Sequence, residues 1–289
     1  MKVWAIMGKL SGYVRLMRPI NCSMIGFAVI VGAALVNTHS LSISGRNLFF
    51  GFITGFTLAG TAMAINDYYD REIDAVNEPN RPIPSGLVKP KEALALTSVL
   101  TVIGFITAYL TNDSCFVLAI IAWIVLMVYT TVGKRSGLPG NFLVSTCIAI
   151  PFIYGSIAVV NSVELGVLIF ASMAFLSNTG REVTKGIADV KGDEMQGVKT
   201  LAVRYGEKNA AIAAAIFYFS AVLLSPIVWF LELVSLWFIP LVAITDLGLA
   251  ASSFMLLKDY SREKARKTKN LILLWFIIGL LAFVAGTVK

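Results

Sequence analysis

The sequence predicts an all-α protein that crosses a membrane several times. Of its 289 residues, 57% are hydrophobic and only 14% are Asp, Glu, Lys or Arg, against roughly 25% charged residues in soluble domains. The mean hydropathy of +0.79 is likewise typical of a chain whose surface mostly faces lipid. The long apolar runs lack the alternation of a membrane barrel, so each is expected to be a helix. A soluble globular fold is excluded.

The apolar runs are about 18 to 22 residues long, which is enough for a helix to cross the hydrocarbon layer. We expect nine transmembrane helices in a single domain that occupies residues 1–289. The expected spans cover residues 19–36, 48–65, 93–110, 115–132, 142–159, 163–179, 210–231, 236–257 and 271–288.

Residues 1–18 have a different pattern. Leu10, Val14 and Met17 fall on one helical stripe, while Lys9 and Arg15 lie largely opposite. This pattern predicts an amphipathic helix at the membrane interface. A signal peptide is disfavoured because charged residues interrupt the apolar stretch and no small-residue cleavage site follows it.

The basic residues predict the orientation in the membrane. The N-terminus and the connections after the second, fourth, sixth and eighth spans hold 22 of the 24 Lys and Arg residues. The positive-inside rule therefore places the N-terminus in the cytoplasm and the C-terminus outside the cell membrane. The same bias explains the net charge of +7, so no nucleic-acid partner is expected. One histidine and three dispersed cysteines exclude an HExxH site and a cysteine metal site.

Two long polar segments on the cytoplasmic side, residues 67–91 and 180–208, are expected to be catalytic loops. In the first, Asn66, Asp70 and Asp74 are spaced by four residues. A helix that continued out of the second span would place their side chains on one face.

The second segment repeats this pattern. It follows the sixth span and carries Asn178, Glu182, Asp189 and Asp193, which would also share one face of a continuous helix. The two segments therefore predict two facing rows of oxygen ligands.

Aligned carboxylates repel one another, and a divalent cation would reverse that effect. Mg²⁺ fits best, because it takes one or two carboxylates and completes its shell with water and substrate phosphate. The two rows therefore predict a diphosphate bound through Mg²⁺, whereas the alternative is that these acids are simply solvated. The sequence contains no P-loop that would hold phosphate without a metal.

Basic and polar residues near these rows are candidates for binding the diphosphate. Arg18 and Asn21 lie at a membrane edge, where an unpaired polar group is costly. Positive-inside bias alone could account for the basic residues in the connections. Those candidates, with a neighbouring tyrosine, are Arg71, Arg81, Tyr129, Lys134, Arg135 and Lys185.

These motifs give the chain a family resemblance. NDYYDREIDAVNEPNRPIPSG and DVKGD resemble the two acidic motifs of the UbiA family of intramembrane prenyltransferases, and the resemblance extends over nearly the whole chain. It implies nine helices around a central cavity, with two cytoplasmic cap loops. It also implies that the catalytic residues are Asp70, Asp74, Asp189 and Asp193, that Asn66 joins them as a Mg²⁺ ligand, and that Asp67 lies beside them.

Within the family, REVTKGIADVKGDEMQGVKTLAVRYG is most similar to the archaeal members that synthesise ether lipids. The expected reaction is Mg²⁺-dependent transfer of a prenyl group, geranylgeranyl in that group, from its diphosphate to geranylgeranylglyceryl phosphate. The chain departs from the group at Gly186, where an acid is usual, and Glu182 could compensate. The expected partners are the prenyl diphosphate, a lipophilic acceptor and membrane lipid, without an obligate protein partner.

Several alternatives stay open. The acceptor could be an aromatic quinone precursor or a chlorophyllide, because both also need a hydrophobic cavity with a polar mouth. An ion-coupled transporter is the rival from another class, since intramembrane acids such as Asp246 often mark ion pathways. Asp246 is expected to face the cavity or to hold two helices together.

Overall fold

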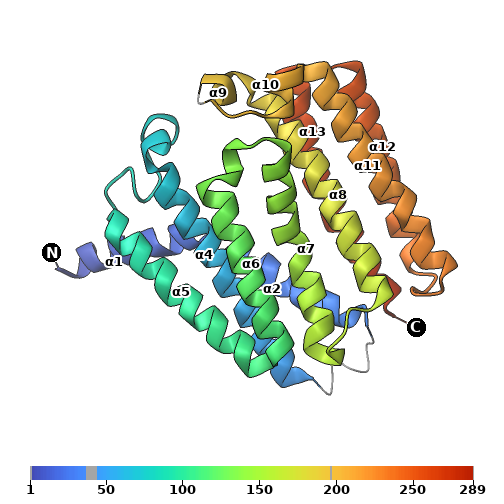
Figure 1. The fold of residues 1–289 in the computed structure, drawn as a ribbon, viewed down its shortest axis with the longest axis horizontal. Coiled ribbons are helices and arrows are strands. Elements are labelled where there is room, and N and C mark those ends of the chain that lie inside the picture. Colours follow the sequence, from blue (N-terminus) through green and yellow to red (C-terminus); the bar gives the residue numbers. More distant parts are fainter. Residues whose placement is uncertain (1, 37–43, 196, 289) are drawn as a thin grey trace.

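The computed structural model describes residues 2–36, 44–195 and 197–288, and in these residues every regular element is a helix (Figure 1). The all-α prediction is confirmed. The first half comprises α1 (Lys2–Met17), α2 (Pro19–Ala34), α4 (Gly45–Asn77), α5 (Pro90–Thr111), α6 (Asp113–Thr131), the 3-10 turn η1 (Gly133–Arg135) and α7 (Leu138–Val160). The second half comprises α8 (Leu165–Ala188), α9 (Val190–Met195), α10 (Leu201–Tyr205), α11 (Glu207–Phe230), α12 (Phe238–Lys258) and α13 (Arg262–Gly286).

Each of the nine expected spans overlaps one long helix. Among the described residues, seven helices are long and apolar enough to cross a membrane, namely α4, α5, α6, α7, α11, α12 and α13. The pair α1 and α2, bent by 42°, forms an eighth candidate. The helix α8 is not among them because it becomes largely polar from Ser177 onwards. The chain is therefore a multi-pass membrane protein, and the count of nine spans stays a prediction.

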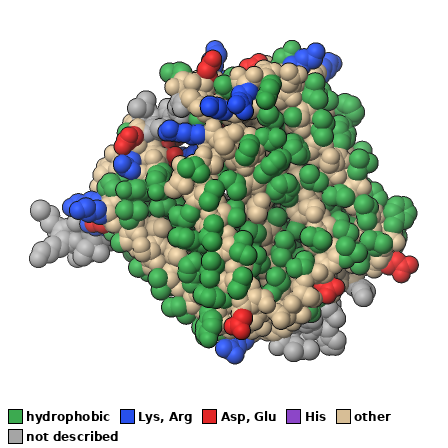
Figure 2. All heavy atoms as spheres, viewed as in Figure 1, with side chains coloured by type: hydrophobic (Ala, Val, Ile, Leu, Met, Phe, Trp, Pro, Cys, Tyr) green, Lys and Arg blue, Asp and Glu red, His purple; other side chains and the backbone are tan. Residues whose placement is uncertain are grey.

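The connections gather at two ends of the bundle. In Figure 1 the α4–α5, α6–α7 and α12–α13 connections lie at the upper end together with α9 and α10. The α5–α6, α7–α8 and α11–α12 connections lie at the lower end. Figure 2 shows a wide hydrophobic surface across the middle, with most of the visible Lys and Arg side chains above it and to its left. This distribution agrees with the charge bias of the sequence.

Two glycines fix how α2 crosses α7. A Cβ atom on Gly155 would lie 2.0 Å from the carbonyl oxygen of Val29, and one on Gly32 would lie 2.1 Å from that of Phe152. Both distances are far inside van der Waals contact, so the two helices touch through their backbones. Small residues at a crossing are typical of helices that pack in a membrane.

The bend between α1 and α2 lies at Arg18, the residue before Pro19. Pro19 disfavours helical geometry at Arg18, which adopts φ 53° and ψ 66° in the left-handed region. Such a conformation costs a non-glycine residue about 1 to 3 kcal/mol. The bend therefore depends on contacts elsewhere that hold Arg18 in place.

Both polar segments begin inside helices. The helix α4 continues to Asn77, as its acid spacing predicted, and residues 78–89 then form a series of hydrogen-bonded turns. Ile83 and Val88 of these turns are buried against Leu16 of α1. In the second segment α8 runs to Ala188 and is followed by the short helices α9 and α10.

Asp246 lies in α12 and makes its hydrogen bond to a neighbouring helix. The hydroxyl of Ser225 in α11 donates to its Oδ2 atom at 2.5 Å. The Oδ1 atom is buried and has no partner among the described residues. This geometry favours the second expectation for Asp246, a contact that holds two helices together.

We predict that Asp246→Asn leaves thermal stability in detergent nearly unchanged, because the amide oxygen still accepts from Ser225. Asp246→Leu cannot accept, so it should lower stability by about 0.6 to 1.7 kcal/mol, the range for hydrogen bonds between membrane helices. Thermal unfolding of Ser225→Ala, Asp246→Leu and the double variant measures the coupling. Fully additive losses would contradict a direct bond.

Candidate active site

The site begins on the polar face of α4, at the end of its apolar stretch. Asn66, Asp67, Asp70 and Asp74 all lie on this helix, as the spacing predicted. Asp67 is only 2% exposed and Asp74 only 6%. Buried carboxylates need cationic or hydrogen-bonding partners, and α4 obtains them from different elements on its two sides.

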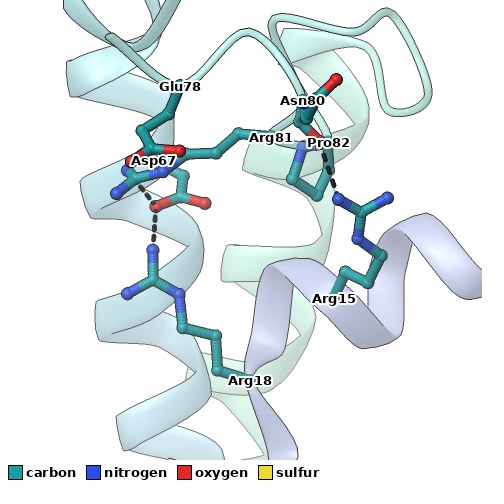
Figure 3. Close-up of a pocket in the computed structure, with 7 residues that line it drawn as sticks. All are labelled: Arg15, Arg18, Asp67, Glu78, Asn80, Arg81 and Pro82. Atoms are coloured by element: carbon teal, nitrogen blue, oxygen red, sulfur yellow. Dashed lines mark hydrogen bonds and ion pairs between the residues drawn. The ribbon is translucent and has the colours of Figure 1, made fainter.

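On one side the partners are arginines. Nη2 of Arg18 lies 2.7 Å from Oδ1 of Asp67 (Figure 3). Nη1 of Arg81 lies 2.6 Å from Oδ2 of Asp74 and 3.4 Å from Oδ1 of Asp67. The two arginines come from the α1–α2 bend and the α4–α5 connection. We call Arg18, Asp67, Asp74 and Arg81 the arginine cluster.

On the other side the partners come from the α6–α7 connection and the end of α6. Lys134 in η1 forms an ion pair with Asp70. The Thr130 hydroxyl donates to Oδ1 of Asn66 at 3.2 Å. We call Asn66, Asp70, Thr130 and Lys134 the lysine cluster. The row of acids on α4 is thus divided between two sets of partners.

The polar part of α8 adds charged groups close to the lysine cluster. Glu182 accepts from Nη1 of Arg181 at 3.0 Å and from Nζ of Lys185 at 3.3 Å. Glu182 is the main reason that the pKa of Lys185 lies above its ordinary value. Tyr129, at the end of α6, lies near enough to Lys185, Glu182 and Asp70 for their charges to act on its hydroxyl.

Asp189 and Asp193 depart from the expected continuous helix. That expectation is wrong beyond Ala188, because Asp189 stands at a break with φ −109° and ψ 9° between α8 and α9. Its carboxylate lies 4.0 Å from Nζ of Lys269. Burial, and then the neighbouring charge of Asp189, raise the pKa of Asp193 to about 6. Asp193 is therefore a carboxylate whose charge a cation would stabilise.

Four polar residues that the sequence analysis named are not part of the arginine cluster or the lysine cluster. Asn21 is exposed at the start of α2. Arg71 lies over the Tyr68 ring, 4.7 Å from its centroid, and pairs with Glu72. Arg135 is exposed, and its main-chain oxygen accepts from Lys199. Asn178 donates to Ser145 inside the bundle at 3.1 Å. Asn21, Arg71 and Arg135 remain predictions as substrate-binding residues.

The residues present fit a hard cation such as Mg²⁺ in their chemistry. Asn66, Asp70, Asp74, Asp189 and Asp193 offer only oxygen atoms, the ligands that Mg²⁺ prefers. Among the described residues no three acidic, histidine or cysteine side chains are grouped closely enough to hold a metal by themselves. The set thus suits a metal that shares its shell with water and an anionic substrate.

Sequence reasoning did not select three polar residues of this region. Thr130 carries no signal of its own, since it lies in an apolar run. Arg15 was assigned only to the polar face of the first helix, yet its Nη2 donates to the Asn80 carbonyl at 2.7 Å. Arg181 has a buried Nε with no partner among the described residues. Its place beside Glu182 was the available signal.

A multi-pass helical protein that gathers carboxylates, lysines and arginines at one end of its bundle belongs to a class that handles anions at a membrane surface. A model of the UbiA prenyltransferase family matches residues 25–283, and the chain belongs to this family. The protein is therefore an intramembrane prenyltransferase, as the resemblance implied.

Relatives match almost the entire chain. Digeranylgeranylglyceryl phosphate synthase of Methanosarcina barkeri is 34% identical over 284 residues, which cover 95% of this chain and 97% of that protein. The synthase of the same name from Pyrococcus furiosus is 36% identical over 281 residues, which cover 96% and 98%.

Solved structures share the fold. A structure of digeranylgeranylglyceryl phosphate synthase has a TM-score of 0.83 at 30% identity and covers 97% of this chain and 99% of that one. A UbiA homologue from Aeropyrum pernix K1 has a TM-score of 0.74 at 21% identity, with 90% and 98% covered. One from Archaeoglobus fulgidus, bound to DMAPP and Mg²⁺, has a TM-score of 0.64 at 16% identity, with 94% and 99% covered. The last two show the fold alone.

Proposed function

We propose that the protein transfers a geranylgeranyl group from its diphosphate to geranylgeranylglyceryl phosphate in archaeal ether-lipid synthesis. The names of the relatives that match almost the whole chain support this acceptor over a quinone precursor or a chlorophyllide. The observation that carries the reaction is the ion pair of Lys134 with Asp70 on the acidic row of α4, at the end of the bundle where α8 leads into α9 (Figure 1).

In this proposal Lys134 and Lys185 bind the diphosphate, and the Tyr129 hydroxyl between them donates to one of its oxygens. Asn66, Asp70, Asp74, Asp189 and Asp193 would hold Mg²⁺, which would supply positive charge next to the leaving diphosphate. The bond between the prenyl carbon and the diphosphate oxygen breaks, and the acceptor hydroxyl forms a new bond to that carbon and loses its proton. Fixed cations around the departing anion favour this step because they need no reorganisation.

Arg18, Arg81 and the supporting residues complete the proposed site. Arg18 and Arg81 hold Asp67 and Asp74 in place beside the diphosphate, and Glu182 fixes Lys185. Asn21, Arg71 and Arg135 would reach the substrate only by changing their present contacts. Gly186 lacks the acid that is usual in the archaeal group, and Glu182, one turn earlier on α8, supplies a carboxylate.

We further propose that nine spans enclose a central cavity, with the segments 67–91 and 180–208 capping its cytoplasmic mouth and the C-terminus outside the cell. The positive-inside bias supports this orientation, and the α4–α5 connection lies at the same end of the bundle as α9 and α10 (Figure 1). An ion-coupled transporter is disfavoured by the same position, since transporter sites lie near the midplane.

The metal role predicts the effect of one substitution. Asp70→Asn keeps the shape of the side chain but removes a negatively charged metal ligand. Turnover should fall by about 100-fold or more, which is the usual effect of removing one group that stabilises charge in a transition state. Prenyl transfer by purified protein with Mg²⁺ measures this, with excess chelator in a parallel assay. Asp246→Asn is the matched control and should retain activity within severalfold. Full activity in chelator, or retained activity in Asp70→Asn, would show that the metal role is wrong.

The orientation predicts which introduced cysteines an impermeant thiol reagent reaches. We replace the three native cysteines by alanine and introduce Ser85→Cys, in the α4–α5 connection, or Ser162→Cys, between α7 and α8. Both serines are exposed. In sealed cells the reagent should label position 162 and not position 85, which should react only after the membrane is opened. The reverse pattern would contradict the proposed topology.

A further inference from the structure

A pocket of about 320 Å³ lies beside the arginine cluster, between α1, α4 and the α4–α5 connection (Figure 3). Lys134 and Tyr129 are not among the residues that line it. Its lining residues are Arg15, Arg18, Asp67, Glu78, Asn80, Arg81 and Pro82. The proposed reaction has used Arg18 and Arg81 only as partners of acids, and it has not used Arg15.

The pocket contains one guanidinium group, that of Arg15, that forms no ion pair among the described residues. Three guanidinium groups and two carboxylates line it, and Asp74, the partner of Arg81, is a third carboxylate beside it. Arg18 and Arg81 share Asp67, and Arg81 also binds Asp74. The hydrogen bond that Arg15 makes goes to a neutral carbonyl, that of Asn80, so this bond does not neutralise the charge of Arg15. The planar guanidinium has further donors suited to phosphate oxygens.

The exposed apolar side chains of α1 indicate that the pocket lies near lipid headgroups. Arg15 is on the amphipathic helix α1, where Leu10 is 63% and Val14 47% exposed. Apolar side chains exposed on such a helix enter the boundary between headgroups and acyl chains. A phosphate attached to a lipid would therefore reach Arg15 while its chains stay in the membrane.

We propose that this pocket binds the phosphate monoester of the lipid acceptor, with Arg15 as its main contact. This rests on the proposed function, because it assumes an acceptor that carries a phosphate. The diphosphate of the donor then binds next to this pocket, at the lysine cluster. Asp67 and Asp70 are three residues apart, which is about 4.5 Å along a helix. A glyceryl phosphate has its free hydroxyl a few bonds from its phosphate, so it can span that separation.

The test compares two acceptors, geranylgeranylglyceryl phosphate and the same lipid without phosphate. The wild-type protein should prefer the phosphorylated acceptor. Arg15→Gln keeps a donor to the Asn80 carbonyl but removes the charge, so the KM for the phosphorylated acceptor should rise roughly tenfold or more. The KM for the prenyl diphosphate should not change. Arg15→Lys should recover part of the loss, because it restores the charge without the planar group.

Arg266→Gln is the matched control, since Arg266 is exposed on α13 at the same end of the bundle and outside the pocket. It should leave both KM values unchanged. An Arg15→Gln protein with an unaltered preference for the phosphorylated acceptor would overturn the inference, as would a rise in the donor KM alone. Equal loss with both acceptors would assign Arg15 to a bulk lipid headgroup instead and also overturn it. If the wild-type protein uses neither glyceryl lipid, the proposed function fails, whatever the variants do.

Discussion

The burial of the Asp67 carboxylate is the constraint on which the site depends. Its side chain is 3% exposed and accepts from both Arg18 and Arg81, so one carboxylate joins α4, the α1–α2 bend and the α4–α5 connection. Removing one partner of a fully buried ion pair costs about 3 to 5 kcal/mol. The arginines are 38% and 33% exposed, so water reduces that cost here. The pair nevertheless offers a reason why Arg18 tolerates a left-handed backbone.

The division of the acidic row of α4 gives one helix two different environments. Asp70 lies with lysines and a tyrosine near α8, whereas Asp67 and Asp74 lie with arginines near α1. Two anionic groups bound at one site repel each other, and this repulsion falls as the distance between them grows. Separate sets of cations on either side of α4 keep such groups apart while the helix holds them in register.

The sequence predicted the helical class and the first acidic row because both follow from periodicity. Apolar runs of membrane length have one solution for their backbone polar groups, and a spacing of four residues fixes a face as long as the helix continues. The second row could not be placed in the same way. Asp189 stands where α8 ends, and no local signal marked that break. Lys134 was selected from the sequence, but its pairing with Asp70 was not, and Thr130 and Arg15 were not selected at all. Tertiary packing brings these residues to their partners from distant segments.

The crossing of α2 and α7 has a consequence for how this sequence can vary over evolution. The three atoms nearest to a methyl group at Gly32 or Gly155 are all backbone atoms, of Phe152 in one case and of Val29, Gly32 and Ala33 in the other. Backbone atoms stay in place when a side chain is replaced. Neighbouring side chains can therefore drift without creating room for a larger residue. In a soluble core, a second substitution to a smaller side chain often makes room for a larger residue. No such second substitution would make room for alanine at Gly32 or Gly155.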